Sequence, residues 1–377
     1  MQYRTMNSTG EQISLLGFGT MRLPVIDGVP ANIDEAETIK MLRSAIDRGV
    51  NYVDTAYPYH GGKSEVAVGK ALKDGYREKV FLADKLPLWL VKSENDLDRI
   101  FGEQLQRLGT DSIDMYLAHN LDRDTWPKVA EFNVMRFLER KRAEGKIKYI
   151  GFSFHDEFDL FQEIIKSYPW DFCQIQLNYM DENFQAGVKG LRLAASLNIP
   201  VIVMEPLKGG KLTDTMPRNI QELWDKAPVR RTPAEWAFRW VADFPEVLTI
   251  LSGMNTMEQV EENLRILSGV EPGSLTEAEL KIIGDVADEY NRLIPHSCTG
   301  CEYCMPCPAG INIPNIIARY NDWHVYEENP KIKRDFKIWV PESGRPSVCM
   351  DCKACEGHCP QHLPVSEIMK KATEIFE

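Results

Sequence analysis

The stretch "VFLADKLPLWLVKSENDLDRIFGEQLQRLGTDSIDMYLAHN", residues 80–120, holds the unit from which the fold can be inferred. It begins with a β-prone run at 80–86 and continues with a run at 93–109 whose apolar residues recur at three- and four-residue spacing. A second β-prone run follows at 112–120. The middle run ends in glycine, as helices commonly do. The order therefore indicates strand, helix and parallel strand, joined by a crossover.

The same alternation extends in both directions from this unit. Further candidate strands begin at residues 15, 52, 147, 172, 199 and 247, and amphipathic runs such as 34–49 and 129–146 lie between them. Eight strand and helix pairs over roughly 250 residues have the size of a (β/α)₈ TIM barrel. A doubly wound open sheet is the structural alternative. We predict an α/β chain built on the barrel.

Two segments flank the predicted barrel. Residues 3–17 place a Ser-Thr-Gly turn between two short β-prone runs, which predicts an N-terminal β-hairpin able to plug the bottom of the barrel. Residues 275–294 read as one more helix, and a cysteine-rich tail follows. We therefore expect a barrel domain over 1–294 and a small second domain over 295–377.

The composition limits the classes of function. The chain has 377 residues, of which 44% are hydrophobic and 27% charged, without the sustained apolar run of a membrane span. Its polar N-terminus lacks a secretory signal, so we expect a cytoplasmic protein. A formal net charge of −12 argues against binding to nucleic acid or an anionic membrane surface. The expected partners are small molecules and proteins.

Several polar residues lie at the ends of the predicted strands, where barrel enzymes place their active groups. Asp54 ends the second strand, with Tyr57 and Tyr59 just beyond it, Lys85 ends the third and His119 the fourth. Each alone is more often a structural residue, but together they form a proton-delivery group. A lysine ammonium beside a phenol is expected to lower the pKa of the tyrosine, while Asp54 holds the lysine. The tyrosine would then act as a general acid.

Three stretches, "NYVDTAYPYHGGKSE" at 51–65, "FLADKL" at 81–86 and "DMYLAHN" at 114–120, resemble the aldo-keto reductases in the right order. The resemblance extends over residues from about 1 to 290. It implies a barrel that binds NAD(H) or NADP(H) across its strand ends and passes hydride to a carbonyl carbon. The implied substrate is a small-molecule carbonyl or alcohol.

The resemblance also implies roles for the strand-end residues. By position, Tyr59 matches the proton donor of the family, and Asp54 and Lys85 match the pair that tunes it. His119 matches the residue that orients or polarises the carbonyl. Tyr57 has the wrong spacing from Asp54 for the donor role.

The cofactor positions of the family match this chain less closely. The residues implied as contacts are Ser153, Gln174, Met204, Leu207, Glu262 and Asn263. The asparagine that usually follows the serine is Phe154, and Met204 stands where an aromatic residue usually stacks on the nicotinamide. Thr256 and Gln259 replace the basic residues that usually hold the 2′-phosphate of NADP. The resemblance therefore leaves both NAD and NADP as candidate cofactors.

Eight of the nine cysteines lie in the last eighty residues. One group follows the ferredoxin pattern C-x₂-C-x₂-C-x₃-C-P, and the other has one residue fewer in its last gap. In a long chain without a secretory signal such cysteines favour metal over disulfides. Two zinc ions are the alternative, although zinc usually takes two separated C-x₂-C pairs. The two groups are Cys349, Cys352, Cys355 and Cys359, and Cys298, Cys301, Cys304 and Cys307.

The ferredoxin pattern exchanges the fourth cysteine between clusters, which predicts two [4Fe-4S] clusters. Cys298, Cys301, Cys304 and Cys359 would hold one, and Cys349, Cys352, Cys355 and Cys307 the other. Helical spacing at 313–329 and 363–377 indicates an α-helical, ferredoxin-like iron-sulfur domain. Such tails resemble those on some bacterial and archaeal aldo-keto reductases.

The leading hypothesis is an NAD(P)-dependent oxidoreductase that interconverts a carbonyl and an alcohol by hydride transfer. Its clusters would relay electrons to or from an electron-transfer protein. The tail stands where the family's substrate-covering loop normally lies, so purely structural clusters are an alternative. A nicotinamide-binding redox sensor is another, and the complete proton-delivery group argues against it.

Overall fold

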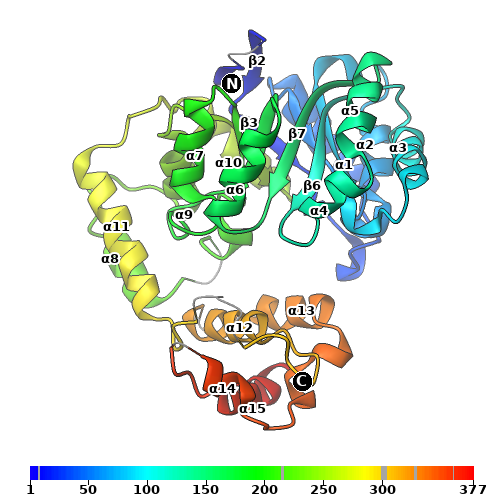
Figure 1. Cartoon of the computed structure of the whole chain (residues 1–377). Coiled ribbons are helices and arrows are strands. Elements are labelled where there is room, and N and C mark those ends of the chain that lie inside the picture. Colours follow the sequence, from blue (N-terminus) through cyan, green and yellow to red (C-terminus); the bar gives the residue numbers. More distant parts are fainter. Residues whose placement is uncertain (7–8, 214–215, 299–303, 327–328, 360) are drawn as a thin grey trace. The chain divides into compact units, whose positions relative to one another are not determined.

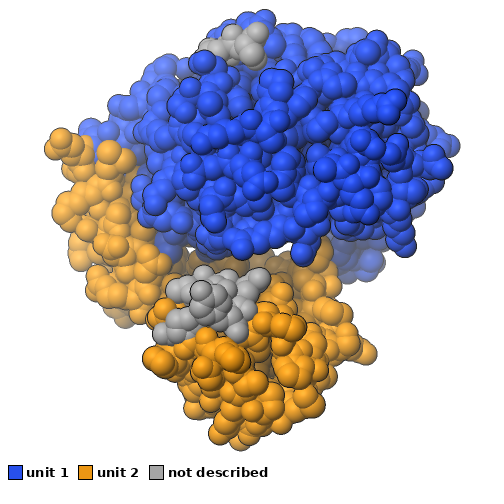
Figure 2. Space-filling model, viewed as in Figure 1, with its two compact units in different colours: residues 1–209, 231–276 blue, residues 210–230, 277–377 orange. Residues whose placement is uncertain are grey.

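The computed structural model describes residues 1–6, 9–213, 216–298, 304–326, 329–359 and 361–377. Its first part is built around parallel strands with helices around the outside (Figure 1). By packing, the chain divides into two compact units, drawn in two colours in Figure 2. The first unit comprises residues 1–209 and 231–276, and the second comprises residues 210–230 and 277–377.

The first unit contains a closed parallel barrel, which confirms the predicted (β/α)₈ fold over the open sheet. Its strand order is β10-β3-β4-β5-β6-β7-β8-β9, and the pairing of β9 with β10 closes it. All eight predicted strands occur. Their bounds are β3 Leu16–Gly19, β4 Tyr52–Asp54, β5 Phe81–Pro87, β6 Ile113–Leu121, β7 Ile147–Phe154, β8 Phe172–Gln176, β9 Val201–Met204 and β10 Val247–Gly253.

Capping residues set where the helices of the first unit begin and end, and the apolar face of each helix packs on the core. In α3, the Asp96 carboxylate accepts the backbone N–H of Ser93 at 3.0 Å, and Gly109 ends the helix with φ of 63°. The helices are α1 Glu35–Asp47, α2 Ser64–Ala71, α3 Glu94–Leu108, α4 Trp126–Glu131, α5 Val134–Ala143, α6 Phe158–Ser167, α7 Gly187–Ser196, α9 Pro233–Ala242 and α10 Met257–Leu267.

The register of the strands brings the predicted polar residues to one end of the barrel. Asp54, the last residue of β4, pairs with Ala83 of β5. Lys85 lies two residues further along β5, and Pro87 pairs with His119 of β6. Because all these strands are parallel, their carboxyl ends form a single mouth.

The N-terminal hairpin closes the other end of the barrel, as predicted. Strand β1 Tyr3–Met6 pairs antiparallel with β2 Glu11–Ser14. Met6 and Ile13 are fully buried in one apolar cluster with Tyr52 and Met115 from the barrel strands. The hairpin therefore extends the core across the bottom of the barrel.

The second unit is helical, as expected for the iron-sulfur domain. Three of its helices, α11, α12 and α15, fall where the sequence predicted helices. The rings of Phe336 and Phe376 stack with centroids 4.7 Å apart, and Trp323 packs on Phe376 at 6.1 Å. The helices are α8 Arg218–Trp224, α11 Glu277–Arg292, α12 Ile313–Val325, α13 Pro330–Trp339, α14 Ala354–His358 and α15 Val365–Phe376.

The second compact unit includes residues that precede 294 in the chain. Helix α11 packs against α8, and the side-chain amide of Asn219 donates to Glu289 Oε1 at 2.7 Å. This pairing groups both helices with the second unit. Residue 295 stays the predicted start of the cysteine-rich domain. No helix among the described residues is long and apolar enough to cross a membrane.

Candidate cluster-binding region and active site

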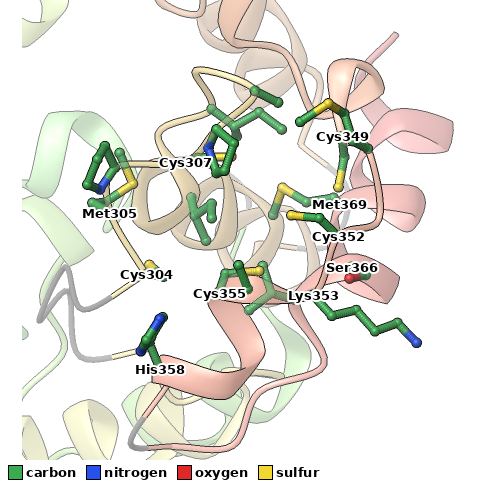
Figure 3. Close-up of a pocket in the computed structure, with 18 residues that line it drawn as sticks. Cys304, Met305, Cys307, Cys349, Cys352, Lys353, Cys355, His358, Ser366 and Met369 are labelled. Carbon is green, nitrogen blue, oxygen red and sulfur yellow. The ribbon is translucent and has the colours of Figure 1, made fainter.

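Five cysteines of the second unit lie around one cavity of about 380 Å³ (Figure 3). They include the complete set that the ferredoxin rule assigns to one cluster. Apolar side chains such as Ile311, Val365 and Met369 line the rest of the wall. Thiolate ligands in an apolar surround are the environment of iron-sulfur clusters. The cysteines are Cys304, Cys307, Cys349, Cys352 and Cys355.

The set predicted for the other cluster is only partly described. Cys301 lies outside the described residues, and Cys298 and Cys359 are partly exposed and not bonded in disulfides. Among the described residues, no three Cys, His, Asp or Glu side chains converge as the ligands of a single metal ion would.

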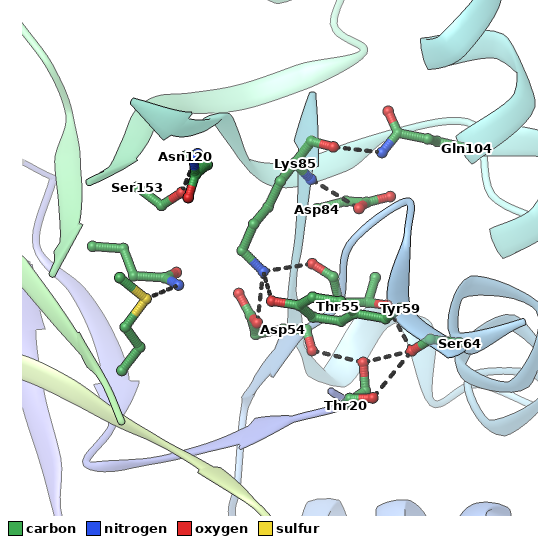
Figure 4. Close-up of polar contacts among 12 residues, drawn as sticks. Thr20, Asp54, Thr55, Tyr59, Ser64, Asp84, Lys85, Gln104, Asn120 and Ser153 are labelled. Atoms are coloured by element: carbon green, nitrogen blue, oxygen red, sulfur yellow. Dashed lines mark hydrogen bonds and ion pairs between the residues drawn. The ribbon is translucent and has the colours of Figure 1, made fainter. Parts of the chain in front are cut away.

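At the barrel mouth, Lys85 forms a buried ion pair with Asp54 (Figure 4). The Lys85 Nζ donates to Asp54 Oδ1 at 2.7 Å and to the carbonyl oxygen of Thr55 at 2.7 Å. Burial by itself lowers the pKa of the Lys85 ammonium, but the negative charge of Asp54 and its hydrogen bond raise that pKa above its ordinary value. The lysine is therefore charged at neutral pH.

Tyr59 lies next to this ion pair, in the short 3₁₀ helix Tyr59–Gly62 that follows β4. Its hydroxyl accepts a hydrogen bond from Lys85 Nζ at 3.4 Å. Burial raises the pKa of Tyr59 and outweighs the charge of Lys85, which lowers it. The net decrease expected from the sequence is therefore not found. A raised pKa keeps the phenol protonated at neutral pH, and this is the form that donates a proton.

The His119 imidazole faces Tyr59 edge-on, with ring centroids 6.3 Å apart. Burial and the positive charge of Lys85 hold the pKa of His119 well below its ordinary value. Its buried Nδ1 has no hydrogen-bond partner among the described residues. The histidine is thus neutral and able to donate or accept one hydrogen bond at the mouth.

Trp89 is a neighbour of His119 that the sequence reasoning missed. Its ring lies 4.9 Å from that of His119, and 39% of its surface is exposed. It follows β5 directly, in the 3₁₀ helix Leu88–Leu90. A large aromatic residue just past the carboxyl end of a barrel strand is a signal that would have identified it.

Tyr57, by contrast, is bonded away from the ion pair. Its hydroxyl donates to Glu103 Oε2 at 2.6 Å, and the Arg107 guanidinium lies 4.2 Å from the centre of its ring. Tyr59 is therefore the tyrosine that meets Lys85, as the resemblance implied.

Asp84 supports the backbone of Lys85 and was also missed. Its Oδ1 accepts the Lys85 N–H at 2.8 Å, and its side chain is fully buried. Burial and the charge of the nearby Glu65 hold the pKa of Asp84 well above its ordinary value. Glu65 is paired with Arg107 at 2.8 Å. A carboxyl group inside a buried strand was the available signal.

Ser153 and Gln174 lie side by side on β7 and β8, where they are register partners. The Ser153 hydroxyl accepts the backbone N–H of Asn120 at 2.8 Å. Gln174 Nε2 donates to Met204 Sδ at 3.4 Å, while its buried Oε1 has no partner among the described residues. An orphaned amide oxygen beside a serine hydroxyl fits a ligand that carries a carboxamide.

Three further residues implied as cofactor contacts lie on the β9 and β10 side of the mouth. Leu207 follows β9. Asn263 of α10 is buried and donates to Ser252 Oγ of β10 at 3.0 Å. Glu262 accepts a hydrogen bond from Thr232 Oγ1 at 2.8 Å.

The residues that replace the family's basic pair form the start of α10. Thr256 is its N-cap, and its hydroxyl accepts the Gln259 N–H at 3.3 Å. The Gln259 side chain in turn accepts the Asn255 N–H at 2.8 Å. This reciprocal capping occupies both side chains without adding positive charge.

Comparison with family models matches residues 15–284 to the aldo/keto reductase family and residues 297–363 to a 4Fe-4S dicluster domain. Among curated relatives, the NADH-specific methylglyoxal reductase of Escherichia coli K12 is 27% identical and aligns over 76% of this chain and 98% of its own. L-galactose dehydrogenase of Arabidopsis thaliana is 26% identical and aligns over 78% of this chain and 96% of its own.

A solved structure supports the same relationship. The holo form of aldo-keto reductase AKR11C1 from Bacillus halodurans superposes with a TM-score of 0.63 at 25% identity, over 76% of this chain and 96% of that one. The chain therefore belongs to the aldo/keto reductase family and is an oxidoreductase with a 4Fe-4S dicluster domain near its C-terminal end.

Proposed function

We propose that the barrel reduces a small carbonyl compound to an alcohol, and catalyses the reverse reaction, with NADH or NADPH. The observation that carries this proposal is the buried Asp54–Lys85 ion pair in contact with a protonated Tyr59. Such a group delivers one proton at a defined position. When bound, the nicotinamide supplies the hydride that the carbonyl carbon requires.

The residues around Tyr59 have separate tasks in this proposal. Tyr59 donates its proton to the carbonyl oxygen as negative charge develops there. Lys85 stabilises the phenolate that remains, because its ammonium lies 3.4 Å from the tyrosine oxygen. His119 is neutral and orients the carbonyl by a hydrogen bond. Asp54 keeps Lys85 charged and in place.

Ser153, Gln174 and Met204 are proposed to hold the nicotinamide ring. The orphaned Gln174 Oε1 would accept the carboxamide N–H, and Met204 would contact the ring face. Thr256 and Gln259 offer no charge to a 2′-phosphate, so we infer that NADH is accepted at least as well as NADPH. The NADH-specific relative from Escherichia coli supports this inference.

The test compares Tyr59→Phe with Tyr57→Phe, using methylglyoxal as a probe aldehyde and following NADH oxidation. Loss of the proton donor should lower kcat by about 10²- to 10⁴-fold. Because Tyr57 bonds to Glu103, its variant should keep near wild-type turnover. NADH affinity should stay within a few-fold in both. Equal turnover in the two variants would remove Tyr59 from the mechanism.

We further propose that the second unit holds two [4Fe-4S] clusters that exchange single electrons with a protein partner. In support, Cys352 and Met350 line the cysteine cavity and are exposed, Met350 by 61%. A cluster bound there would therefore lie near the surface, as electron transfer between proteins requires. Structural clusters are the competing account. Clusters that bleach when the anaerobic protein is mixed with a reduced ferredoxin, and recover on reoxidation, would favour electron exchange, whereas clusters that no such donor reduces would favour a structural role.

A further inference from the structure

Arg22 lies at the barrel mouth, three residues beyond β3, and no motif in the sequence singles it out. Strand β3 pairs with β10, and Gly19 is the register partner of Gly253. A Cβ on Gly253 would lie 3.1 Å from Arg22 Cβ and 3.4 Å from Arg22 Cδ. The stem of the arginine therefore lies across the carboxyl end of β10.

The guanidinium of Arg22 extends from there to the loop that follows β9. A Cβ on Gly209 would lie 3.0 Å from Arg22 Nη2. Gly209 has φ of +69°, a conformation that favours glycine. Both this conformation and the nearby guanidinium therefore disfavour a side chain at position 209. Arg22 thus joins the ends of β3, β9 and β10 within the first unit.

The charge of Arg22 is not neutralised within the described parts of the chain. The side chain is exposed and forms no ion pair among the described residues, whereas two other cations near the mouth are occupied. Lys85 is paired with Asp54, and Lys208 Nζ lies 2.5 and 2.6 Å from the two carboxylate oxygens of Asp181. A free cation beside exposed backbone is suited to bind an anion.

The position of Arg22 identifies which anion. In the proposed function the nicotinamide lies by Gln174 and Met204, and the family resemblance implies that Asn263 of α10 contacts the adenine end. A dinucleotide that joins these places must cross the ends of β9 and β10, and its pyrophosphate is the middle of the molecule. We propose that the Arg22 guanidinium binds the cofactor pyrophosphate, an assignment that rests on the proposed function.

The test is calorimetric titration of the anaerobic holoprotein with NADH and with NADPH. Loss of a charge-assisted hydrogen bond in Arg22→Ala should raise the Kd of both cofactors by about 10- to 100-fold. Arg22→Lys should restore part of the affinity, because it returns the charge but not the planar fork. Arg48→Ala, which removes an exposed arginine just after α1, should bind as wild type and controls for net charge.

Three results would overturn this assignment. The Kd of NADH in Arg22→Ala could stay within threefold of wild type, or the loss could be confined to NADPH, which would place Arg22 on the 2′-phosphate. The loss could also appear only in the KM of the carbonyl substrate at saturating NADH, which would place Arg22 on the substrate. Wild-type protein that binds neither cofactor would instead refute the proposed function. Thermal melting of each variant checks that it is folded.

Discussion

At the scale of single residues, Lys85 and its neighbours show how burial decides the chemistry of the mouth. A fully buried ammonium is costly unless it is paired, and the Asp54 carboxylate provides the pair. The same burial raises the pKa of Tyr59 and lowers that of His119. The site therefore presents a charged lysine, a neutral imidazole and a protonated phenol at the same pH.

The raised pKa of Tyr59 predicts how activity depends on pH. Carbonyl reduction needs the neutral phenol, which predominates below its pKa, and burial places that pKa above its ordinary value of about 10. Because the low pKa of His119 keeps it neutral, kcat for reduction should be nearly flat from about pH 6 to 9. Stopped-flow rates at saturating cofactor would check this. An inflection near neutral pH that disappears in His119→Gln would show that His119 titrates instead.

The identity of these residues could be predicted from the sequence, but their environment could not. Asp54, Lys85 and His119 were expected at strand ends because each follows a β-prone run. Whether the pKa of Tyr59 rises or falls depends on how far the fold buries its hydroxyl. The spacing of residues in the sequence does not show this. Trp89 and Asp84 were missed because their roles arise from packing around their neighbours.

At the scale of elements, a close contact at glycine fixes two neighbouring helices of the first unit to each other. Gly69 of α2 meets the C-terminal end of α3. A Cβ there would lie 2.7 Å from the carbonyl carbon of Leu108 and 2.9 Å from the carbonyl oxygen of Arg107. Backbone atoms cannot move aside as a side chain can, so the two helices require glycine here.

Gly69→Ala should therefore lower the free energy of unfolding by about 1–3 kcal/mol. Gly102→Ala is the matched control, because Gly102 lies exposed inside α3 with nothing within 4 Å of an added Cβ. That control should gain about 1 kcal/mol from helix propensity. Chemical denaturation of the barrel, followed by far-UV circular dichroism, compares the two. A stability change of the same sign in both variants would contradict the packing argument.

The periodicity of apolar residues located the strands and the long helices well. A helix buries one apolar stripe, and a strand of the barrel buries a continuous apolar run, so both leave a pattern in the sequence. Strand β5 was expected at 80–86 and spans Phe81–Pro87. Helices α13 and α14 were not predicted. Helix α14 is five residues long and lies inside a cysteine motif, where ligand spacing masks helical periodicity. The pairing of α8 with α11 joins segments far apart in the chain, so no local pattern could show it.

At the scale of the whole molecule, the two units have separate cores and separate chemistry. The barrel core contains Met6, Ile13 and the strand residues, whereas Trp323, Phe336 and Phe376 pack the helical unit. Metal ligands commonly couple binding to folding of their own domain. Loss of the clusters should therefore unfold or loosen the second unit and leave the barrel intact.

Iron content tests this expectation. Wild-type protein purified without oxygen should carry about eight iron atoms per chain, as two [4Fe-4S] clusters require. Cys349→Ala combined with Cys352→Ala should lose at least half of that iron while the melting transition of the barrel persists. Cys173→Ala is the control, because Cys173 is buried in β8 and burial raises the pKa of its thiol. Loss of iron in this control as well would contradict the ligand assignment.

In the proposed reaction, hydride passes directly from the nicotinamide to a carbonyl carbon held beside Tyr59, and the clusters take no part in that step. The most direct measurement mixes anaerobic protein with excess NADH that carries deuterium at the transferring position and with methylglyoxal, and follows cluster absorbance and product together. Direct transfer should place one deuterium on the new carbinol carbon of each product molecule, at a rate that Tyr59→Phe reduces. Alcohol formed without deuterium, while the clusters bleach and recover at the turnover rate, would contradict it.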